Sequence, residues 1–132
     1  MTKAKDPVPL DKLFRALADP TRLRLVNLMW EQEICVCYFT EVIGVPQPKI
    51  SRHLAYLRRA GIVAARRQGR WMHYRLVTPQ DTNTAGILKS TIDALNVNSQ
   101  MQRDKARLHR ACSGATSLVQ VLGAPLPSLV SM

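Results

Sequence analysis

Two cysteines separated by a single residue, Cys35 and Cys37, are the side chains of this sequence best suited to chemistry. Thiolates select soft metal ions and metalloids. Ten residues after Cys37 begins the segment Gln47-Pro-Lys-Ile-Ser-Arg-His-Leu54, whose polar and basic side chains suit phosphates and base edges. Because one short predicted helix separates the two features, an ion held by the thiols would disturb the basic segment. The spacing predicts a switch.

The net charge of +10 is concentrated in one part of the chain. The window 46–80 contains eight Lys and Arg residues and no Asp or Glu. Such a run is often only a solvated face, but one that spans a helix and a hairpin favours a phosphate backbone as partner. We therefore expect double-stranded DNA to be the partner.

Composition limits the remaining classes of protein. A chain of 132 residues can form one compact domain with a core, or a small domain and a tail. No apolar run approaches the roughly 20 residues of a membrane span, and residues 1–7 lack the apolar region of a secretory signal. Three cysteines do not form a secreted disulfide framework. We expect a cytoplasmic protein.

Apolar periodicity and turn residues predict the order of elements. We expect helices near 8–18, 20–31, 34–42 and 48–60, strands at 62–67 and 71–77, and a helix from the Thr78-Pro79 cap to about residue 96. Gly44 should end the third helix. This order predicts a mainly α fold with a small β-hairpin, a winged helix-turn-helix, in a dimeric protein.

The chain divides into two predicted parts. Residues 1–98 form the DNA-binding and dimerisation domain, and residues 99–132 form a C-terminal extension that carries Cys112. A polar helix over 100–112 and a loosely packed tail of 20 residues are expected there. The predicted dimerisation residues are Leu10, Leu13, Phe14, Leu88, Ile92 and Leu95.

The predicted DNA contacts come from the fourth helix and the hairpin. On the helix they are Gln47, Lys49, Ser51, Arg52, His53 and Tyr56, and at the hairpin they are Arg66, Arg67 and Arg70. His53 lies nearer the core flank, so a hydrogen bond to the backbone and one to a phosphate are both open. Each phosphate contact should steepen the fall of affinity with salt.

Three motifs carry a resemblance to a known family. Glu33-Ile-Cys-Val-Cys37, Gln47-Pro-Lys-Ile-Ser-Arg-His-Leu54 and Gly69-Arg-Trp-Met-His-Tyr-Arg-Leu76 resemble the ArsR/SmtB repressors, and the similarity covers about residues 10–95. The resemblance implies a dimeric repressor that binds its operator when ligand-free and releases it when an inducer binds. A Cys-Val-Cys at this place is typical of the branch that senses trivalent arsenic and antimony.

The sequence departs from that family pattern at one ligand position. In the best-known pattern a third cysteine follows the pair by three residues, and here Thr40 occupies that position. The resemblance implies that Cys112 supplies the third thiolate for As(III) or Sb(III), from the same subunit or its partner. No catalytic cofactor is implied. Pro46 also stands where the family commonly has a Ser cap.

The spacing of the cysteine pair is itself a constraint. On an ideal helix residues i and i+2 point roughly 200° apart, so both thiols cannot face one ion. They converge only in an extended lead-in to the helix or in an unwound first turn. A helix N-terminus would also lower cysteine pKa values and favour thiolates.

Several alternatives remain. The cysteines could be small buried apolar residues, or Cys35 or Cys37 could pair with Cys112 in a redox-sensing repressor. A ligand-blind architectural DNA binder is also open. A zinc site on the fifth helix is disfavoured because that helix lacks histidine, and His109 is expected to be a surface residue. A thiol enzyme is disfavoured because Cys-x-x-Cys spacing and an acid–base constellation are absent.

Overall fold

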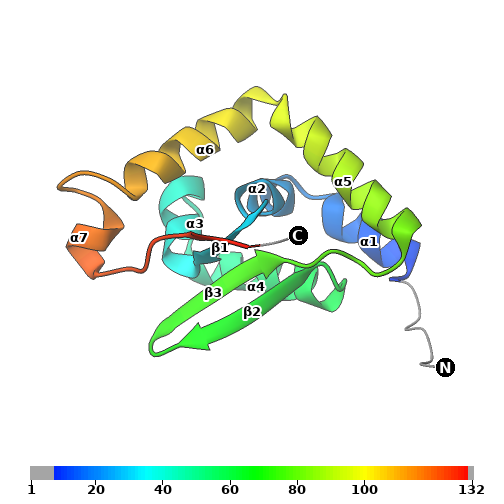
Figure 1. The fold of residues 1–132 in the computed structure, drawn as a ribbon, viewed down its shortest axis with the longest axis horizontal. Helices are drawn as coiled ribbons and strands as arrows, with labels where there is room; N and C mark the ends of the chain where they lie inside the picture. Colours follow the sequence, from blue (N-terminus) through cyan, green and yellow to red (C-terminus); the bar gives the residue numbers. More distant parts are fainter. Residues whose placement is uncertain (1–7, 131–132) are drawn as a thin grey trace.

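The computed structural model describes residues 8–130, which form seven helices and four strands in that range (Figure 1). The elements in chain order are α1 Leu10–Leu17, α2 Pro20–Leu28, β1 Gln32–Cys35, α3 Val36–Ile43, α4 Gln47–Arg59, β2 Val63–Gln68, β3 Trp71–Leu76, α5 Thr82–Asn96, α6 Ser99–Ala111, α7 Leu118–Leu122 and β4 Ser128–Leu129. Figure 1 shows α5 and α6 forming an arch over α1, α2 and α3, with the β2–β3 hairpin on the other side. The predicted mainly α class with a small β-hairpin is confirmed.

Local signals explain where the central helices begin and end. Asp19 caps α2, because its carboxylate accepts a hydrogen bond from the Arg22 amide at 3.0 Å and Pro20 occupies the first helical position. Gly44 ends α3 with a φ of 76°, a left-handed conformation that glycine adopts without steric cost. Both signals were predicted. Asp19 thus sets the start of α2, and Gly44 begins the short turn between α3 and α4.

The four strands form one antiparallel sheet in the order β2-β3-β1-β4. Gln68 pairs with Trp71 across a two-residue turn, which completes the predicted hairpin. The next neighbour, β1, was not predicted; it places Cys35 opposite His73 of β3. The C-terminal strand β4 then pairs Ser128 with Glu33. The sheet therefore joins the cysteine segment to both the β2–β3 hairpin, which we call the wing, and the C-terminal strand β4.

The core lies between the helices and the inner face of this sheet. On α4 the predicted inward residues Ile50, Leu54 and Leu57 are fully buried. A buried ion pair fastens α6 to α2, since Arg24 donates to both carboxylate oxygens of the fully buried Asp104 at 2.7 and 2.8 Å. This link sets the position of the helix that ends at Cys112.

Three sequence expectations need correction. The cysteine segment begins as a strand, so α3 starts at Val36 instead of Ile34, and α2 ends at Leu28 instead of residue 31. The cap of α5 is Asp81, whose carboxylate accepts from the Thr84 amide at 2.9 Å. That short-range bond places the start of α5 beyond the expected Thr78-Pro79 cap.

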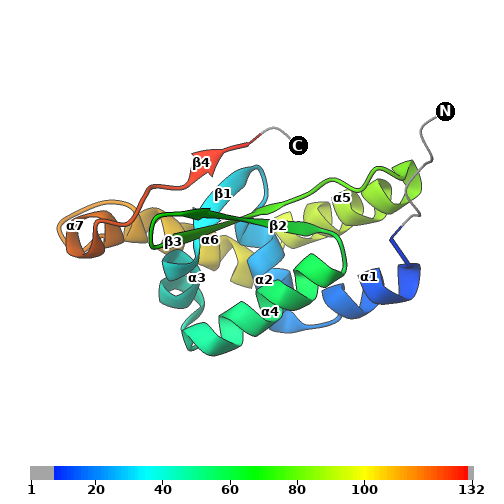
Figure 2. The same cartoon turned by 90° about the horizontal axis from the view of Figure 1, so that it is seen from below.

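The last 20 residues are more ordered than the expected loose tail. Within the described range they contain α7 and β4, and both Leu118 and Ala124 are buried. Backbone pairing to β1 and apolar burial hold this segment across the molecule, as Figure 2 shows for β4 beside β1. In the described part of the chain, no helix combines the length and apolarity needed to cross a membrane.

The predicted dimerisation residues divide into two groups. Leu13, Leu88, Ile92 and Leu95 are buried in the chain's own core, so their apolar spacing is explained by packing within one chain. Leu10 and Phe14 of α1 are 52% and 51% exposed. A surface for a second copy therefore stays a prediction, and these two residues are the members of the set available to it.

Candidate thiol site and DNA-binding surface

The two cysteines of the pair lie side by side at the junction of β1 and α3. Cys35 is the cap residue of α3, with an extended backbone at φ −67° and ψ 142°, and Cys37 lies in the first turn. The Cys37 thiol donates to the Cys35 sulfur at an Sγ–Sγ distance of 3.4 Å. An extended lead-in is one of the two conditions under which the pair was predicted to converge. It brings two soft ligands together.

This hydrogen bond shifts the pKa values of the two thiols in opposite directions. The hydrogen bond from Cys37 lowers the pKa of Cys35 to about 7, against the opposing effect of burial. The same bond, with burial, raises the pKa of Cys37. A thiolate at Cys35 that holds the remaining proton on Cys37 explains both directions. The pair therefore holds one sulfur that is substantially thiolate near neutral pH.

Cys112 approaches this region from the end of α6. Tyr38, the residue after Cys37, has its pKa raised by burial and then by the negative charge of Cys112, Cys37 and Cys35. The Tyr38 hydroxyl is buried and has no hydrogen-bond partner in the described part of the chain. All three sulfurs therefore lie within electrostatic reach of one unsatisfied hydroxyl.

The three thiols do not form a closed ligand set in this structure. Within residues 8–130, no three His, Cys, Asp or Glu side chains are arranged to hold one metal ion. Cys112 instead lines a hollow of about 390 Å³ between α6 and the C-terminal segment, together with Gln32, His109 and Pro127. Burial raises the pKa of Cys112. His109 is exposed, as expected.

The cysteine pair is connected to both the basic helix α4 and the β2–β3 hairpin. Cys35 pairs with His73 in β3, which is the second strand of the wing. Cys37 lies in the first turn of α3, and only Gly44, Val45 and Pro46 separate the end of α3 from α4. One eight-residue helix and a three-residue turn therefore separate the cysteine pair from the basic helix.

The outer face of α4 presents the basic surface that the sequence predicted. Gln47, Lys49 and Arg52 are exposed, whereas Ser51 and Tyr56 are half-buried. A shallow hollow of about 560 Å³ runs along this face, lined by Arg22, Lys49, Arg52, His53, Ala55, Tyr56 and Arg59. Its lining contains no acidic residue, so it suits a polyanion.

Arg22 organises this surface, and sequence reasoning missed it. Its guanidinium donates to the Ala16 and Arg15 carbonyls at 2.8 and 2.9 Å and lies 4.1 Å from the centre of the Tyr56 ring. A further nitrogen lies 3.2 Å from His53 Nδ1. Burial lowers the pKa of His53, so a neutral ring accepts this bond. His53 thus binds a side chain of α2, which neither predicted partner anticipated.

The three wing arginines have different surroundings. Arg66 pairs with the buried Glu33, with a shortest N–O distance of 2.6 Å, and this pair lowers the pKa of Glu33. Arg70 lies over the Trp71 ring at 4.6 Å and donates to the Leu122 carbonyl at 3.0 Å. Arg67 donates only to the carbonyl of nearby Gly69 among the bonds of the described chain. Arg67 is therefore the freest of the three.

Comparison with known proteins gives a consistent picture. The family described as bacterial regulatory protein, arsR family, matches residues 19–65. The arsenic resistance transcriptional regulator ArsR1 of Pseudomonas putida is 47% identical over 83 residues, covering 62% of this chain and 65% of that protein. The regulator ArsR2 of the same organism, with the same description, is 41% identical over 95 residues, covering 71% and 80%. The chain thus spans a little under two thirds of ArsR1.

A solved structure adds a match in three dimensions. The crystal structure of the AntR antimony-specific transcriptional repressor is similar at a TM-score of 0.53 and 25% identity. The match covers 72% of this chain and 89% of that chain.

Proposed function

Because the chain belongs to the arsR family of bacterial regulatory proteins, we propose that it is a transcriptional repressor released from its operator by trivalent arsenic or antimony. The family consists of regulators, not enzymes, which sets the thiol-enzyme alternative aside. The inducer binds Cys35 and Cys37, and Cys112 supplies the third thiolate. The relatives named for arsenic resistance and the antimony-specific repressor support a metalloid as the ligand class.

The observation that carries the proposal is the geometry of the two adjacent sulfurs. They lie 3.4 Å apart at the start of α3. At this separation both sulfurs can bind the same ion, and thiolates select soft metals and metalloids. The pair therefore offers two adjacent soft ligands to As(III) or Sb(III).

Closure of the site supplies the coupling to DNA. A third thiolate from Cys112 must move toward the pair, because the described residues contain no closed three-ligand set. That movement changes the contact of α6 and the C-terminal segment with α3 and β1, on which α4 and the wing depend. If metalloid and DNA favour different arrangements of these elements, each weakens the binding of the other by linkage.

The test measures release of DNA by each ion. An operator is recovered by selection from a pool of random duplexes and labelled for fluorescence anisotropy. Arsenite and antimony tartrate are then titrated against the complex under a phosphine reductant, which contains no thiol to compete for the ion. We expect release by at least one of the ions. Cys35→Ser/Cys37→Ser protein should stay bound at concentrations at least 100-fold higher.

Two further measurements separate the alternatives. Cys112→Ser should weaken the response, and an unchanged response would remove Cys112 as the third ligand. Release by an oxidant alone, with none by either ion under full reduction, would replace the metalloid proposal by the redox-sensing one. Unchanged regulation in Cys35→Ser/Cys37→Ser protein would indicate a ligand-blind architectural DNA binder.

A further inference from the structure

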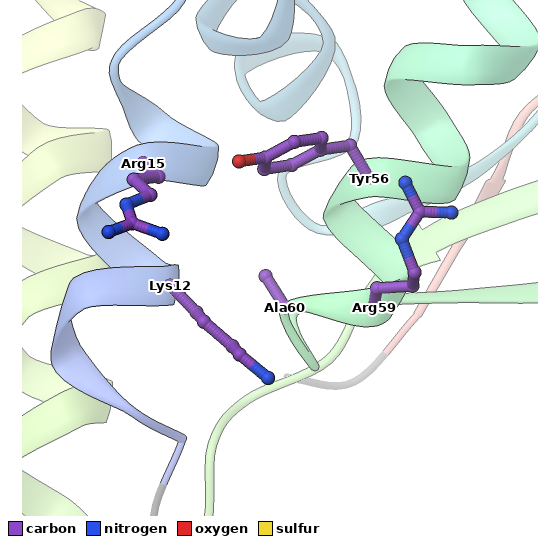
Figure 3. A pocket seen from close by; sticks show the side chains of 5 residues that line it. All are labelled: Lys12, Arg15, Tyr56, Arg59 and Ala60. Atoms are coloured by element: carbon purple, nitrogen blue, oxygen red, sulfur yellow. The ribbon is translucent and has the colours of Figure 1, made fainter.

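A second basic cavity shares only Tyr56 with the predicted DNA-binding residues. It has a volume of about 230 Å³ and lies between α1 and the C-terminal end of α4, lined by Lys12, Arg15, Tyr56, Arg59 and Ala60. Figure 3 shows Lys12 and Arg15 on the α1 wall, with Tyr56 and Arg59 on the α4 wall and Ala60 between them. The Tyr56 hydroxyl points across the cavity toward α1 (Figure 3).

The charged side chains that line this cavity are all positive. Its lining carries three cations and no carboxylate. Asp11 lies 3.9 Å from Arg15, but the two side chains are 64% and 70% exposed, so water screens this pair strongly. Three like charges around one hollow repel each other, and a bound anion would remove that repulsion. The cavity therefore has the charge of an anion site.

The cavity is continuous with the α4 surface. Tyr56 and Arg59 line both this cavity and the larger hollow along α4. Arg22 and Arg59 lie near the Tyr56 ring, with guanidinium carbons 4.1 and 5.8 Å from the ring centre. In Figure 2, α1 and α4 run along the same side of the molecule. A partner lying along α4 therefore reaches α1.

Size and position together indicate which anion fits. A volume of 230 Å³ is below the roughly 300–1,000 Å³ of sites for small organic ligands. From Arg52 to Arg59 the helix rises about 10 Å, and the major groove is about 12 Å wide. When the N-terminal half of α4 lies in the groove, its C-terminal end lies beside the flanking sugar–phosphate strand.

We propose that Lys12, Arg15, Tyr56 and Arg59 form a seat for a backbone phosphate of duplex DNA, which extends the DNA interface from α4 to α1. The proposal rests on the DNA binding proposed above. Lys12 and Arg15 supply charge from α1, Tyr56 donates its hydroxyl, and Arg59 closes the side shared with the α4 surface. The seat fixes the orientation of α4 and is blind to base sequence, because it touches only phosphate.

The test uses a fluorescein-labelled 40-base-pair duplex of mixed sequence and the full chain, with anisotropy measured over a series of salt concentrations. Phosphate contacts act on any sequence, so the operator is not required. Lys12→Gln/Arg15→Gln should weaken binding about tenfold or more at 0.1 M salt. It should also lower the slope of log affinity against log salt by about 1 for each phosphate that the variant leaves without a cation. Tyr56→Phe should weaken binding by a smaller factor.

The matched control removes two cations from a helix away from this surface. Arg103→Gln/Arg110→Gln makes the same charge change at two exposed positions of α6 and should keep both affinity and slope within about twofold. Circular dichroism melting of each variant checks that its fold is intact. If the α1 variant matches the α6 control while Lys49→Gln/Arg52→Gln weakens binding, the seat is wrong and the DNA-binding proposal stands. A wild-type chain that does not bind the duplex overturns both.

Discussion

The basic surface on α4 and the thiol site at the start of α3 differ in how exposed and how complete they are. Lys49 and Arg52 are exposed and line an open hollow without acidic residues. Cys35 is buried and Cys37 half-buried, with Cys112 outside the pair. Under the proposed function, the DNA side is formed in advance, whereas the ligand side becomes complete only when Cys112 joins the pair. A repressor that binds DNA until a ligand arrives requires this asymmetry.

The largest expected effect tests whether the two regions can be separated. Lys49→Gln/Arg52→Gln should lower affinity for the selected operator by about 100-fold, because the α4 surface then lacks two exposed cations. The number of metalloid ions bound per protein and their affinity should not change, since neither residue lies near the thiols. Anisotropy measures the first and equilibrium dialysis the second. A parallel fall in metalloid binding would show that the surfaces are one site.

The second prediction concerns the lowered pKa of Cys35. A cysteine of pKa about 7 is about half thiolate at pH 7, so alkylation of Cys35 by iodoacetamide should reach half of its own maximal rate near pH 7 instead of near the ordinary 9.0. The Cys35 rate should rise with pH to a plateau above about 8. Mass spectrometry of the alkylated peptides follows each cysteine.

Cys37→Ala supplies the control for that measurement. It removes the hydrogen bond that lowers the pKa of Cys35, so the midpoint should move upward toward 9.0. Cys112, whose pKa is raised by burial, should react slowly throughout. A Cys35 midpoint near 9.0 in the wild-type protein would contradict the lowered pKa of Cys35.

The third prediction concerns the wing, which carries predicted DNA-binding arginines and also pairs with the strand that ends at Cys35. Arg66→Gln leaves the buried carboxylate of Glu33 without its partner and should lower the melting temperature by about 3–8 °C. The same change at the neighbouring exposed Arg67 should shift it by less than about 2 °C. Calorimetry compares the two. A larger effect at Arg67 would show that the ion pair does not hold β1 to the wing.

The pH dependence of this difference has a definite sign. The pair lowers the pKa of Glu33 below its ordinary 4.5, so its contribution to stability is present at neutral pH. The contribution is lost as pH falls through the lowered value. Wild-type and Arg66→Gln protein should therefore approach each other in stability only below about pH 4.5.

Sequence patterns predicted what depends on local signals and missed what depends on distant partners. The Asp19-Pro20 start, the Gly44 stop and the buried stripe of α4 follow from spacing alone. Strand β1 was missed because four residues with an apolar Ile34-Cys35 end resemble the first turn of a helix. Its stability comes from pairing with β3, nearly 40 residues later, which no local pattern records.

The candidate site shows the same division. The types and spacing of Cys35 and Cys37 indicated soft-ion chemistry, and the structure adds their convergence. The partners of Arg66 and Arg70 could not be predicted, because Glu33 and the Leu122 carbonyl reach them only through the sheet and the C-terminal segment. The cations Lys12 and Arg15 carry a weak signal, a spacing of three on α1, but their importance depends on which helix α1 packs beside.

The smallest expected effect concerns Tyr38, which lies next to Cys37 in the chain. Tyr38 has a buried hydroxyl without a hydrogen-bond partner in the described chain, and such a group costs about 1–3 kcal/mol. Tyr38→Phe should therefore leave the free energy of unfolding unchanged or raise it by up to about 1 kcal/mol in urea titrations. Tyr74→Phe, on β3 and also buried, is the control for aromatic volume.

The same variant asks whether closure of the site uses that hydroxyl. If the three sulfurs gather around Tyr38 when the metalloid binds, a thiolate becomes the missing acceptor for its hydroxyl proton. The ligand-free protein then gains stability from Tyr38→Phe while the metalloid complex loses it, so metalloid affinity falls. Equal affinities in both proteins would place the closed site away from Tyr38, and with it the path by which Cys112 approaches the pair.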